Sequence, residues 1–472
     1  MTVADTTVNE AAIAPMGEPR ARDFAGLLSR DAWLFAAVAV LIPNLPFLFL
    51  SIFACPTRTL SISLYVMVAM LALWVPAWIA VALLVLAVGL DVVQVIAGVF
   101  DLGPDEIVAS IQYAVAFDVF ASPVYLVIAA ALVTTTIATA ILIVRYRQNL
   151  RRARALPALL CAFALLAFDV SANALTLKKM GFLYEAQTPF DSAIAQTGLD
   201  ADAIAASGHN VLLVVVEGMG AFDDPAHQAL LAGALQTAGL DDAHTLTTGM
   251  SRYVGSTTGA ESRELCGAWG NHRDYMDKAH GDCLPARLAA KGYDTAAFHA
   301  FTGDFFDRRD WYPNIGFAHA AFMEELTRTD PKMATHHCGL TLTGLCDLDV
   351  ADKVEAFMTQ AGDTPRFGYW LTLNTHMPVP ADIGTPRLGC ADGGPFGDRT
   401  VCMMTEMWID VLKRVAAIAR DPRLKTTDIL IVGDHNPPLW TRHGRGLFRP
   451  GHVTWFALKA KDGAAPQRHA SR

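Results

Sequence analysis

The sequence predicts two fold classes in one chain: an α-helical membrane domain of about five transmembrane helices, followed by an α/β domain with a central, mostly parallel sheet. Apolar runs dominate up to about residue 175, whereas charged and apolar residues are interspersed beyond that point, as in a globular domain. In this second part, short apolar runs alternate with helical patterns, which is typical of parallel sheets. Three of these runs lead directly to acidic or histidine side chains.

Several apolar runs in the first part are long enough to cross a bilayer, which takes about 20 helical residues. The run from Leu60 to Phe100 is too long for one such helix at a rise of about 1.5 Å per residue. We place a break near Trp74, Pro76 and Trp78, because proline and interfacial aromatics favour a membrane surface. The alternative is one long tilted helix. The expected spans are approximately 31–54, 60–79, 80–100, 120–144 and 156–175.

Arginines flank these spans unevenly. They precede the first span and lie between the fourth and the fifth: Arg20, Arg22, Arg30, Arg145, Arg147, Arg151, Arg152 and Arg154. The loop 101–119 is acidic and contains no lysine or arginine. Because basic loops remain in the cytoplasm, five spans would place the C-terminal part outside it. We therefore expect a bacterial inner (plasma) membrane location, with a periplasmic or otherwise extracytoplasmic C-terminal domain.

These patterns divide the chain into four parts. We expect a cytoplasmic N-terminal segment, a transmembrane domain, a juxtamembrane connector and an extracytoplasmic catalytic domain. Their predicted bounds are 1–30, 31–175, 176–206 and 207–472. The net charge of −9 argues against a nucleic acid as the partner of this protein.

Six of the eight cysteines lie in the C-terminal part and form successive close couples. Such couples predict three short-loop disulfides in an oxidising compartment, in agreement with the extracytoplasmic placement. Other connectivities are open, so pairing between neighbours is one choice among several. A zinc cluster is the competing interpretation, although this part contains no C-x-x-C. The couples are Cys266 and Cys283, Cys338 and Cys346, and Cys390 and Cys402.

Polar side chains follow three predicted strands at the point where each strand ends. Ligands of open α/β sheets bind beyond the carboxyl ends of the strands, so we expect these side chains to converge on one site. Carboxylate oxygens and imidazole nitrogens together suit zinc or manganese. Taken singly, each residue also has a structural explanation, such as an acid at a helix start or a turn. The runs are 210–216, 367–373 and 429–432, and the residues are Glu217, His376, Asp434 and His435.

A nucleophile for the same site is predicted in the segment 255–262, which reads as a turn leading into a helix. Exposed amides at a helix start favour a phosphate. A threonine hydroxyl such as that of Thr257 is a weak nucleophile until it is activated, and a metal ion activates it by stabilising the alkoxide. The alternative is that Thr257 and Thr258 only cap this helix.

The order of five motifs then indicates a family. They are V-V-V-E-G-M-G, G-S-T-T-G-A-E-S, F-F-D-R-R-D-W-Y-P-N-I-G-F, L-N-T-H-M-P and V-G-D-H. This order resembles the alkaline phosphatase/sulfatase superfamily, and within it the membrane-anchored lipoteichoic acid synthases and phosphoethanolamine transferases. These relatives have five N-terminal spans and an extracytoplasmic catalytic domain. The resemblance therefore covers essentially the whole chain and implies an alkaline-phosphatase-like domain in the predicted catalytic part.

The resemblance implies roles for the matching residues. Thr257 would be the threonine that becomes transiently phosphorylated. Together with Glu217, Asp434 and His435 it would also be a ligand of the metal ion. His376 would contact the phosphorylated substrate.

Five further residues receive expectations, four of them from the same resemblance. Arg308 would hold a substrate phosphate, for which a guanidinium fork is well suited, and Arg309 takes that role if the register differs by one. His443 would match a downstream histidine of the phosphoethanolamine transferases, with His452 as the competing choice. His299 follows a predicted strand and would face the site.

Two further expectations concern other side chains. Glu261 would orient the helix that carries Thr257. The pair His336 and His337 would either contact the substrate or lie on the surface without a role in binding.

Two departures from the family pattern bear on function. Sulfatases use a cysteine in C-x-P/S-x-R, but Cys266 is followed by Gly267-Ala268-Trp269. Sulfate-ester hydrolysis is therefore not expected. In addition, the Arg308 segment resembles the phosphoglycerol-transferring synthases, whereas the cysteine couples resemble the phosphoethanolamine transferases. The donor headgroup stays open between the two.

The function that the resemblance implies is metal-dependent transfer of a phospholipid headgroup through a phosphothreonine. The cofactor would be Zn²⁺ or Mn²⁺, the donor a membrane phospholipid, and the acceptor an envelope glycan or a lipid-linked molecule. A phosphatase or phosphodiesterase that uses water as the acceptor is the first alternative. An inactive scaffold or sensor of envelope assembly is the second.

Overall fold

The computed structural model describes residues 29–51, 57–100, 102–173, 189–237, 239–381 and 383–461. These residues form two compact units. The first lies within Met1–Pro46, Arg58–Leu90 and Leu132–Phe168, and the second within Phe47–Thr57, Asp91–Ala131 and Asp169–Arg472. Most of the predicted N-terminal segment 1–30, and residues 176–188 of the predicted connector 176–206, lie outside the described residues.

Helices occupy the described part of every predicted span. Within these residues, α5 and α7 are long and apolar enough to cross a membrane, and α4 and α9 are apolar but shorter. The structure therefore supports two spans by length and composition, and the count of five remains a prediction. The helices are α2 (Arg30–Ala36), the π-helical η1 (Ala37–Leu41), α3 (Ile42–Ser51), α4 (Thr59–Leu71), α5 (Ala77–Val99), α7 (Pro123–Arg145), α8 (Arg147–Arg152) and α9 (Leu156–Asn173).

The apolar run from Leu60 to Phe100 is divided into two helices, as the sequence predicts. Helix α4 ends at Leu71 and α5 begins at Ala77, directly after Pro76. Proline has no N–H to donate, so it suits a position at a helix start. The break lies near Trp74 and Pro76 as predicted, but it comes earlier than the boundary after residue 79 that the predicted spans imply. The alternative of one long helix is wrong.

The segment between α5 and α7 is folded and belongs to the second unit. It contains a short α-helix and two 3₁₀ turns, where the sequence indicates only an acidic loop. Their bounds are α6 (Pro104–Ser110), η2 (Ile111–Ala116) and η3 (Val119–Ala121).

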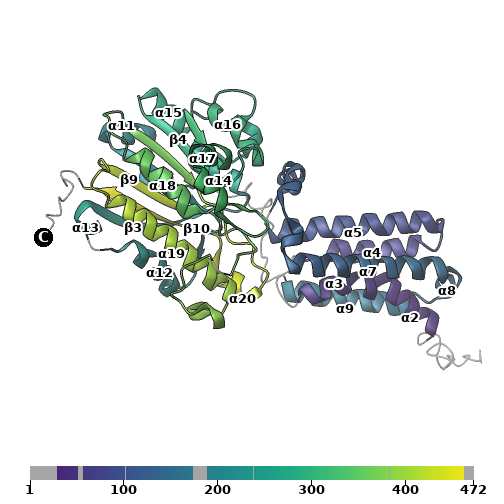
Figure 1. The fold of residues 1–472 in the computed structure, drawn as a ribbon. Coiled ribbons are helices and arrows are strands. Elements are labelled where there is room, and N and C mark those ends of the chain that lie inside the picture. The colour runs from purple at the N-terminus through teal and green to yellow at the C-terminus, as the bar shows by residue number, and fades with distance from the viewer. Residues whose placement is uncertain are drawn as a thin grey trace, which may run out of the picture. The chain divides into compact units, whose positions relative to one another are not determined.

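An eight-stranded sheet forms the centre of the second unit, in the order β2-β10-β9-β1-β8-β4-β5, with β3 paired to β10 (Figure 1). The strands from β9 to β5 are parallel, and β10 is antiparallel to its neighbours. The predicted, mostly parallel sheet is confirmed. The strands are β1 (Asn210–Val216), β2 (Gly220–Phe222), β3 (His244–Arg252), β4 (Asp294–His299), β5 (His319–Ala321), β8 (Arg366–Leu371), β9 (Thr427–Gly433) and β10 (Phe448–Ala460).

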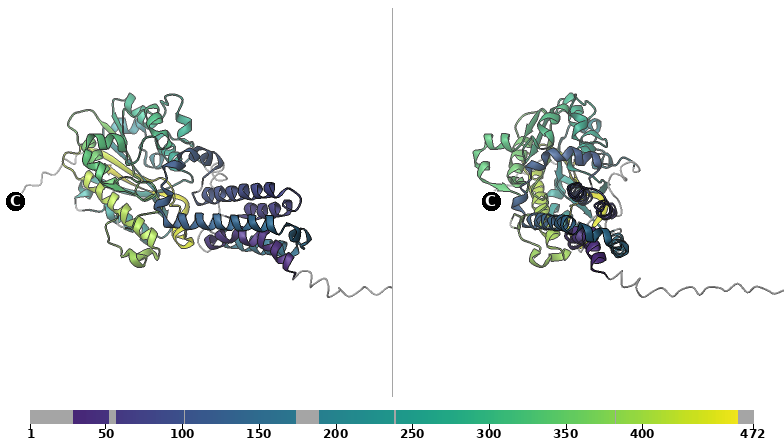
Figure 2. Two further views of the ribbon diagram at one scale, coloured as in Figure 1. Left: turned by 45° about the vertical axis from the view of Figure 1, so that its right-hand side comes forward. Right: turned by 90° about the vertical axis from the view of Figure 1, so that its right-hand side faces the viewer.

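Strand β1 is buried on both faces, which explains its unbroken apolar sequence. Leu212, Val214 and Val216 pack into one core together with residues of α12, α18 and α19. The alternate residues of the strand pack into a second core, with residues of α11, α14, α15 and α16. Helices therefore cover both faces of the sheet, as the two views of Figure 2 show.

The helices of this unit have the following bounds: α10 (Ala193–Thr197), α11 (Ala201–Ser207), α12 (Pro225–Leu235), α13 (Leu240–Ala243), α14 (Thr257–Cys266), α15 (Leu284–Ala290), α16 (Arg308–Asn314), α17 (Met323–Thr329), α18 (Asp347–Met358), α19 (Arg399–Ala419) and α20 (Arg442–Gly446). A separate two-stranded sheet consists of β6 (His337–Cys338) and β7 (Gly344–Leu345).

Three disulfides join the neighbouring cysteines of the second unit: Cys266–Cys283, Cys338–Cys346 and Cys390–Cys402. The first connects the end of α14 to the start of α15, and the last connects η9 (Cys390–Asp392) to α19. Each closes a short loop, so each restrains a local piece of the chain.

We expect the double substitution Cys266→Ser, Cys283→Ser to lower the free energy of unfolding of the second unit by roughly 3 kcal/mol, because this disulfide closes a loop with a sequence separation of 17. Denaturant unfolding of the full chain in detergent measures the change. Cys161→Ser, which removes a free thiol of the first unit, is the control and should have no such effect. Free thiols at the six paired positions in non-reducing peptide maps would contradict the pairing.

Candidate active site

The register of two neighbouring strands brings two acidic side chains together. In the parallel pair β1 and β9, Val216 lies opposite Gly433. The next residues along the two strands are Glu217 and Asp434, so both carboxylates leave the sheet at the same edge. Glu217 is 5% and Asp434 0% exposed.

The hydroxyl of Thr257 lies among the predicted metal ligands. Its Oγ1 is 3.0 Å from Asp434 Oδ2 and 3.5 Å from both Glu217 Oε2 and His435 Nε2. The His435 nitrogen is in turn 3.3 Å from Asp434 Oδ2 and 3.5 Å from Glu217 Oε1. Two carboxylates, one imidazole and one hydroxyl thus face one small space. The four residues that the sequence places in the metal site are together in the structure.

The charges of this cluster favour a divalent cation. Burial, followed by the charge of Asp434, raises the pKa of Glu217 well above its usual range. The carboxylates of Glu217 and Asp434 both lie within 3.5 Å of the Thr257 hydroxyl. Two buried carboxylates that are this close together repel each other unless a positive charge compensates them. Their oxygens and the imidazole nitrogen are ligands that zinc and manganese accept. The donor set therefore fits the predicted ion.

Backbone amides fix the orientation of Asp434. Its Oδ1 accepts hydrogen bonds from the N–H of Gly218 at 2.7 Å and from that of His435 at 2.6 Å. The other oxygen, Oδ2, is left to face Thr257. The two functions of the carboxylate, holding the turn and facing the site, are thus divided between its two oxygens.

The backbone of Glu217 is held by the segment that follows β8 and by α19. Its N–H donates to Thr372 Oγ1 at 2.9 Å. Its carbonyl accepts from Thr375 Oγ1 at 2.6 Å and from Trp408 Nε1 at 3.2 Å. These three residues were not predicted as part of the site, because no sequence pattern shows that they reach the backbone of Glu217.

Thr257 is the first residue of α14, and Ser256 is its N-cap. The Ser256 Oγ accepts from the N–H of Gly259 at 3.4 Å, and Thr258 Oγ1 lies 3.1 Å from it. The capping role that the sequence left open for the two threonines therefore belongs to Ser256. The hydroxyl of Thr257 faces the acidic cluster instead.

His376 follows β8 and lies close enough to the cluster for its charges to matter. Burial, and then the charge of His435, lowers the pKa of His376 to about 4, while Asp434 acts in the opposite direction. Its Nδ1 is buried and has no hydrogen-bond partner among the described residues. A neutral imidazole beside the cluster suits the predicted contact with substrate, which stays a prediction.

Arg308 is 1% exposed, and all three guanidinium nitrogens have protein partners. Nε and Nη2 donate to Glu261 Oε2 at 3.1 and 2.8 Å, and Nη1 donates to the carbonyl of Phe305 at 3.1 Å. The predicted contact of Arg308 with a substrate phosphate would therefore require Glu261 to give up this pairing. Arg309 is more exposed and pairs with acidic residues of α17 and with Asp304.

Glu261 anchors α14, one turn after Thr257. It is fully buried and accepts from Arg308 and from the hydroxyls of Tyr312 at 2.5 Å and Tyr369 at 3.1 Å. These partners come from α16 and β8. The orientation of α14 is thus tied to two other elements through one carboxylate.

Two predicted histidines have other surroundings. His299 is 3% exposed, and its Nδ1 lies 3.0 Å from the carbonyl of Leu371. Burial and then the charge of Arg308 lower the pKa of His299 to about 3, so this ring is neutral inside the domain. His443 is exposed on α20, with its Nε2 2.7 Å from the carbonyl of Phe396. Substrate contacts for both remain predictions.

Asp347 is a buried acid that the sequence did not indicate. It is the first residue of α18 and accepts from the backbone N–H groups of Leu373 and Asn374 at 2.8–3.1 Å. Burial raises the pKa of Asp347 to about 7, against the effect of these hydrogen bonds. It holds the chain just before His376. In the sequence it is indistinguishable from an ordinary acid at a helix start.

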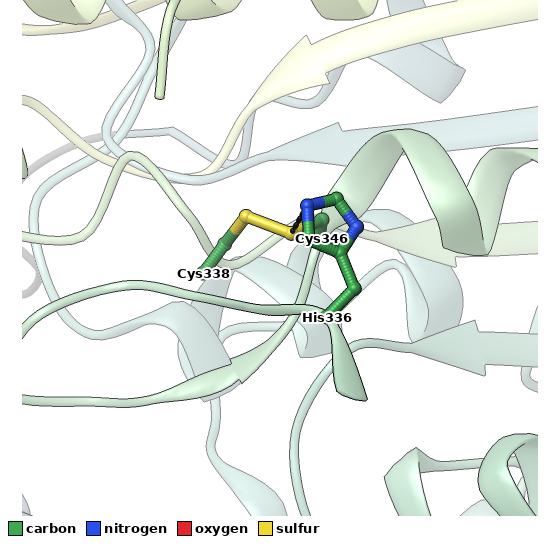
Figure 3. Close-up of side chains that lie close together, drawn as sticks. All are labelled: His336, Cys338 and Cys346. Carbon is green, nitrogen blue, oxygen red and sulfur yellow. Dashed lines mark hydrogen bonds between the residues drawn. A yellow bond between two sulfur atoms is a disulfide. The ribbon is translucent and has the colours of Figure 1, made fainter. Parts of the chain in front are cut away.

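A second group of possible ligands, His336, Cys338 and Cys346, is shown in Figure 3. The two sulfurs are bonded to each other, so neither offers a thiolate to a metal. His336 Nε2 lies 3.5 Å from Cys346 Sγ, and its Nδ1 lies 2.6 Å from Asp349 Oδ2. For this pair of cysteines, the competing zinc interpretation is wrong.

Comparison with family models matches residues 209–455 to the family described as Sulfatase. The chain belongs to the sulfatase family. This confirms the superfamily that the order of motifs indicates, and it assigns the protein to enzymes of the phosphotransferase or hydrolase type. The matched region contains every residue of the candidate cluster.

Solved structures similar to this sulfatase-family chain include the following three. The lipoteichoic acid synthase LtaP from Listeria monocytogenes is 15% identical, with a TM-score of 0.39, over 55% of this chain and 67% of that one. The phosphoglycerol transferase GacH from Streptococcus pyogenes, in complex with sn-glycerol-1-phosphate, is 15% identical, with a TM-score of 0.38, over 58% and 77%. The zinc complex of the periplasmic domain of EptC from Escherichia coli is 13% identical, with a TM-score of 0.35, over 54% and 73%.

Comparison with curated proteins gave no match. The assignment to the family therefore depends on the match to residues 209–455.

Asp434→Ala should abolish binding of a divalent metal, because it removes the oxygen that faces the cluster and leaves two backbone N–H groups without their acceptor. Thr257→Ala should retain the metal, since both carboxylates and the imidazole remain. Elemental mass spectrometry of the purified full chain measures the content. Asp349→Ala is the control acid. Equal metal in Asp434→Ala and wild type would place the ion elsewhere.

Metal binding should weaken as the pH falls. Because burial raises the pKa of Glu217, the metal-free carboxyl keeps its proton to a higher pH than an ordinary glutamate, and an ion must displace that proton. Calorimetric titration in two buffers of different ionisation enthalpy should show net proton release. Glu217→Gln should bind metal more weakly and release fewer protons. Binding without proton release in the wild type would contradict this account.

Proposed function

We propose that this protein is a membrane-anchored, metal-dependent transferase that moves a phospholipid headgroup through a covalent phosphothreonine at Thr257. The observation that supports this proposal is the position of Thr257 Oγ1, within 3.5 Å of three candidate ligand side chains. The stretch of this sulfatase-family chain that fits C-x-P-x-R, 283–287, has its cysteine in the disulfide Cys266–Cys283. The hydroxyl of Thr257 would therefore take the place of the nucleophile at the metal site.

Glu217, Asp434, His435 and Thr257 would hold the ion. When bound, a divalent ion lowers the pKa of the Thr257 hydroxyl and neutralises the buried carboxylates. In the first step, the Thr257 oxygen attacks the phosphorus of a phospholipid, and the bond from phosphorus to the diacylglycerol oxygen breaks. The proton lost from Thr257 is balanced by the proton that the departing diacylglycerol gains. His376 would contact the phosphate at this stage.

In the second step, a hydroxyl of the acceptor attacks the phosphothreonine. The bond between phosphorus and Thr257 Oγ1 breaks, the headgroup phosphate passes to the acceptor, and Thr257 recovers a proton. The proposed acceptor is an envelope glycan or a lipid-linked molecule. The same residues serve hydrolysis when water takes the place of the acceptor. The complete cluster argues against an inactive scaffold, because loss of any one member would have favoured that role.

Location in the membrane supports a lipid donor. Helices α5 and α7 are long and apolar enough to cross a bilayer, and we propose five spans with the catalytic domain in the periplasm. The three disulfides agree with an oxidising compartment. A membrane-anchored enzyme meets its lipid donor at a high local concentration, so part of the entropy of association is saved. Phosphoethanolamine and phosphoglycerol remain the two proposed headgroups, and Zn²⁺ and Mn²⁺ the two proposed ions.

Mass spectrometry should detect the covalent intermediate. Incubation of the full chain with phosphatidylethanolamine or phosphatidylglycerol, without acceptor, should add a headgroup phosphate to the peptide that contains Thr257. Thr257→Ala should lose turnover by at least about 10³-fold, because the first bond cannot form. Thr257→Ser is the matched variant and should keep measurable activity through its hydroxyl. Full activity in Thr257→Ala would make a metal-activated water the better account, and free headgroup phosphate as the only product would identify a hydrolase.

A further inference from the structure

The segment between α5 and α7 contacts the catalytic part of the second unit at several points. Arg273 Nη2 donates to the carbonyl of Val108 at 3.3 Å. The Tyr113 hydroxyl donates to Asp307 Oδ2 at 2.5 Å. The N–H of Asp118 donates to the carbonyl of Thr341 at 2.9 Å. In this way the whole segment, from α6 to η3, is fixed to the domain that carries the site.

The contact nearest to the nucleophile is made by Glu106 of α6. Its Oε1 accepts a hydrogen bond from the N–H of Ser256 at 3.0 Å. Its Oε2 accepts from the N–H of Gly103, at the start of its own helix, at 2.9 Å. One carboxylate therefore connects the start of α6 to the residue that immediately precedes Thr257.

The same turn is held from its other side by Tyr253. The Tyr253 hydroxyl donates to the carbonyl of Ser256 at 2.5 Å, so both polar backbone groups of Ser256 have a side-chain partner. Gly255, directly before it, has a φ of 142°, a conformation that favours glycine. A Cβ at this position would lie 2.8 Å from the Tyr253 hydroxyl and 3.4 Å from Glu106 Oε1. The turn is thus enclosed by these two side chains.

We propose that Glu106 is a positioning residue for Thr257, and that the segment between α5 and α7 is therefore a working part of the active site. Ser256 is the N-cap of α14, so its backbone fixes the direction in which the helix starts and Thr257 Oγ1 points. Without the carboxylate, the N–H of Ser256 loses its acceptor and the turn at Gly255 is held from one side only. A displacement of about 1 Å in a reacting group costs on the order of 10²-fold in rate.

This inference rests on the proposed function for its kinetic consequence, but its structural consequence is independent of the substrate. Glu106 acts through Ser256, so its loss should lower kcat and leave the KM for the donor almost unchanged. A carboxylate that bound the headgroup directly would instead change KM. The variant Glu106→Gln separates the effect of the negative charge from that of the hydrogen bond, because the amide oxygen of glutamine also accepts a hydrogen bond from the Ser256 N–H.

The test uses the full chain and its variants E106A, E106Q and V115A in vesicles of phosphatidylethanolamine and phosphatidylglycerol, with added metal. Hydrogen exchange of the peptide 253–266 reports on the turn, and initial rates at several donor concentrations report on catalysis. In E106A we expect faster exchange at the start of α14, a kcat lower by at least about tenfold and a KM within about twofold of wild type. E106Q should retain the exchange pattern and at least about a third of kcat, since it keeps the acceptor. V115A, which removes part of a side chain that is 92% exposed on the same segment, should match wild type.

Unchanged exchange in E106A would refute the inference, and so would altered exchange with an unchanged kcat. A raised KM with a wild-type exchange pattern would also refute it and would make Glu106 a direct contact of the headgroup. If the wild type transfers or releases neither headgroup, the proposed function fails. In that case exchange in E106A, compared with E106Q, still decides whether Glu106 holds the turn that carries Thr257.

Discussion

The parallel register of β1 and β9 is the constraint on which the candidate site depends. Since Val216 lies opposite Gly433, the two residues that follow must bring their carboxylates to one edge of the sheet. A shift of one position would turn every side chain of the strand to the opposite face and would disrupt both cores. The apolar residues of β1, which pack alternately into the two cores, hold this register in place. Packing of the sheet thus creates the close pair of acids.

The buried carboxylates of Glu217 and Asp434 repel each other, and the surrounding residues reduce this repulsion. One oxygen of Asp434 accepts hydrogen bonds from two backbone N–H groups. Burial and the neighbouring acids raise the pKa of Glu217, and the positive charge of Arg308 acts in the opposite direction. Arg308 itself is compensated by Glu261. Removing one partner of a buried ion pair such as Arg308–Glu261 lowers the stability of the fold by about 3–5 kcal/mol, because the other charge stays buried without a partner. We interpret the pair as a device that fixes α14 and α16 relative to each other, more than as a source of net stability.

The division of the chain into units differs in an informative way from its division by hydropathy. By sequence, residues 91–131 belong to a region of membrane helices. In the structure they belong to the same compact unit as the central sheet, and one of them, Glu106, accepts a hydrogen bond from the Ser256 N–H. A short acidic loop in a hydrophobic region has no periodic pattern that would show its fold. Its conformation follows from its contacts with the catalytic part.

The sequence by itself determined the elements whose pattern repeats locally. It predicted a break near Trp74, Pro76 and Trp78, the mostly parallel sheet and the superfamily, because apolar periodicity and motif order do not depend on distant residues. It also named Glu217, Asp434 and His435, since residues at strand ends converge in any open α/β sheet. Thr257 was named from the turn before a predicted helix and from the resemblance of its motif to the family. Only the tertiary structure decided the partners of those residues. That Arg308 faces Glu261, that Ser256 caps α14, and that Asp347, Thr372 and Glu106 support the site are consequences of contacts between segments far apart in the chain. Hydrogen bonds of this kind leave no trace in local sequence, because a buried acid and a surface acid at a helix start look alike until the fold brings their partners to them.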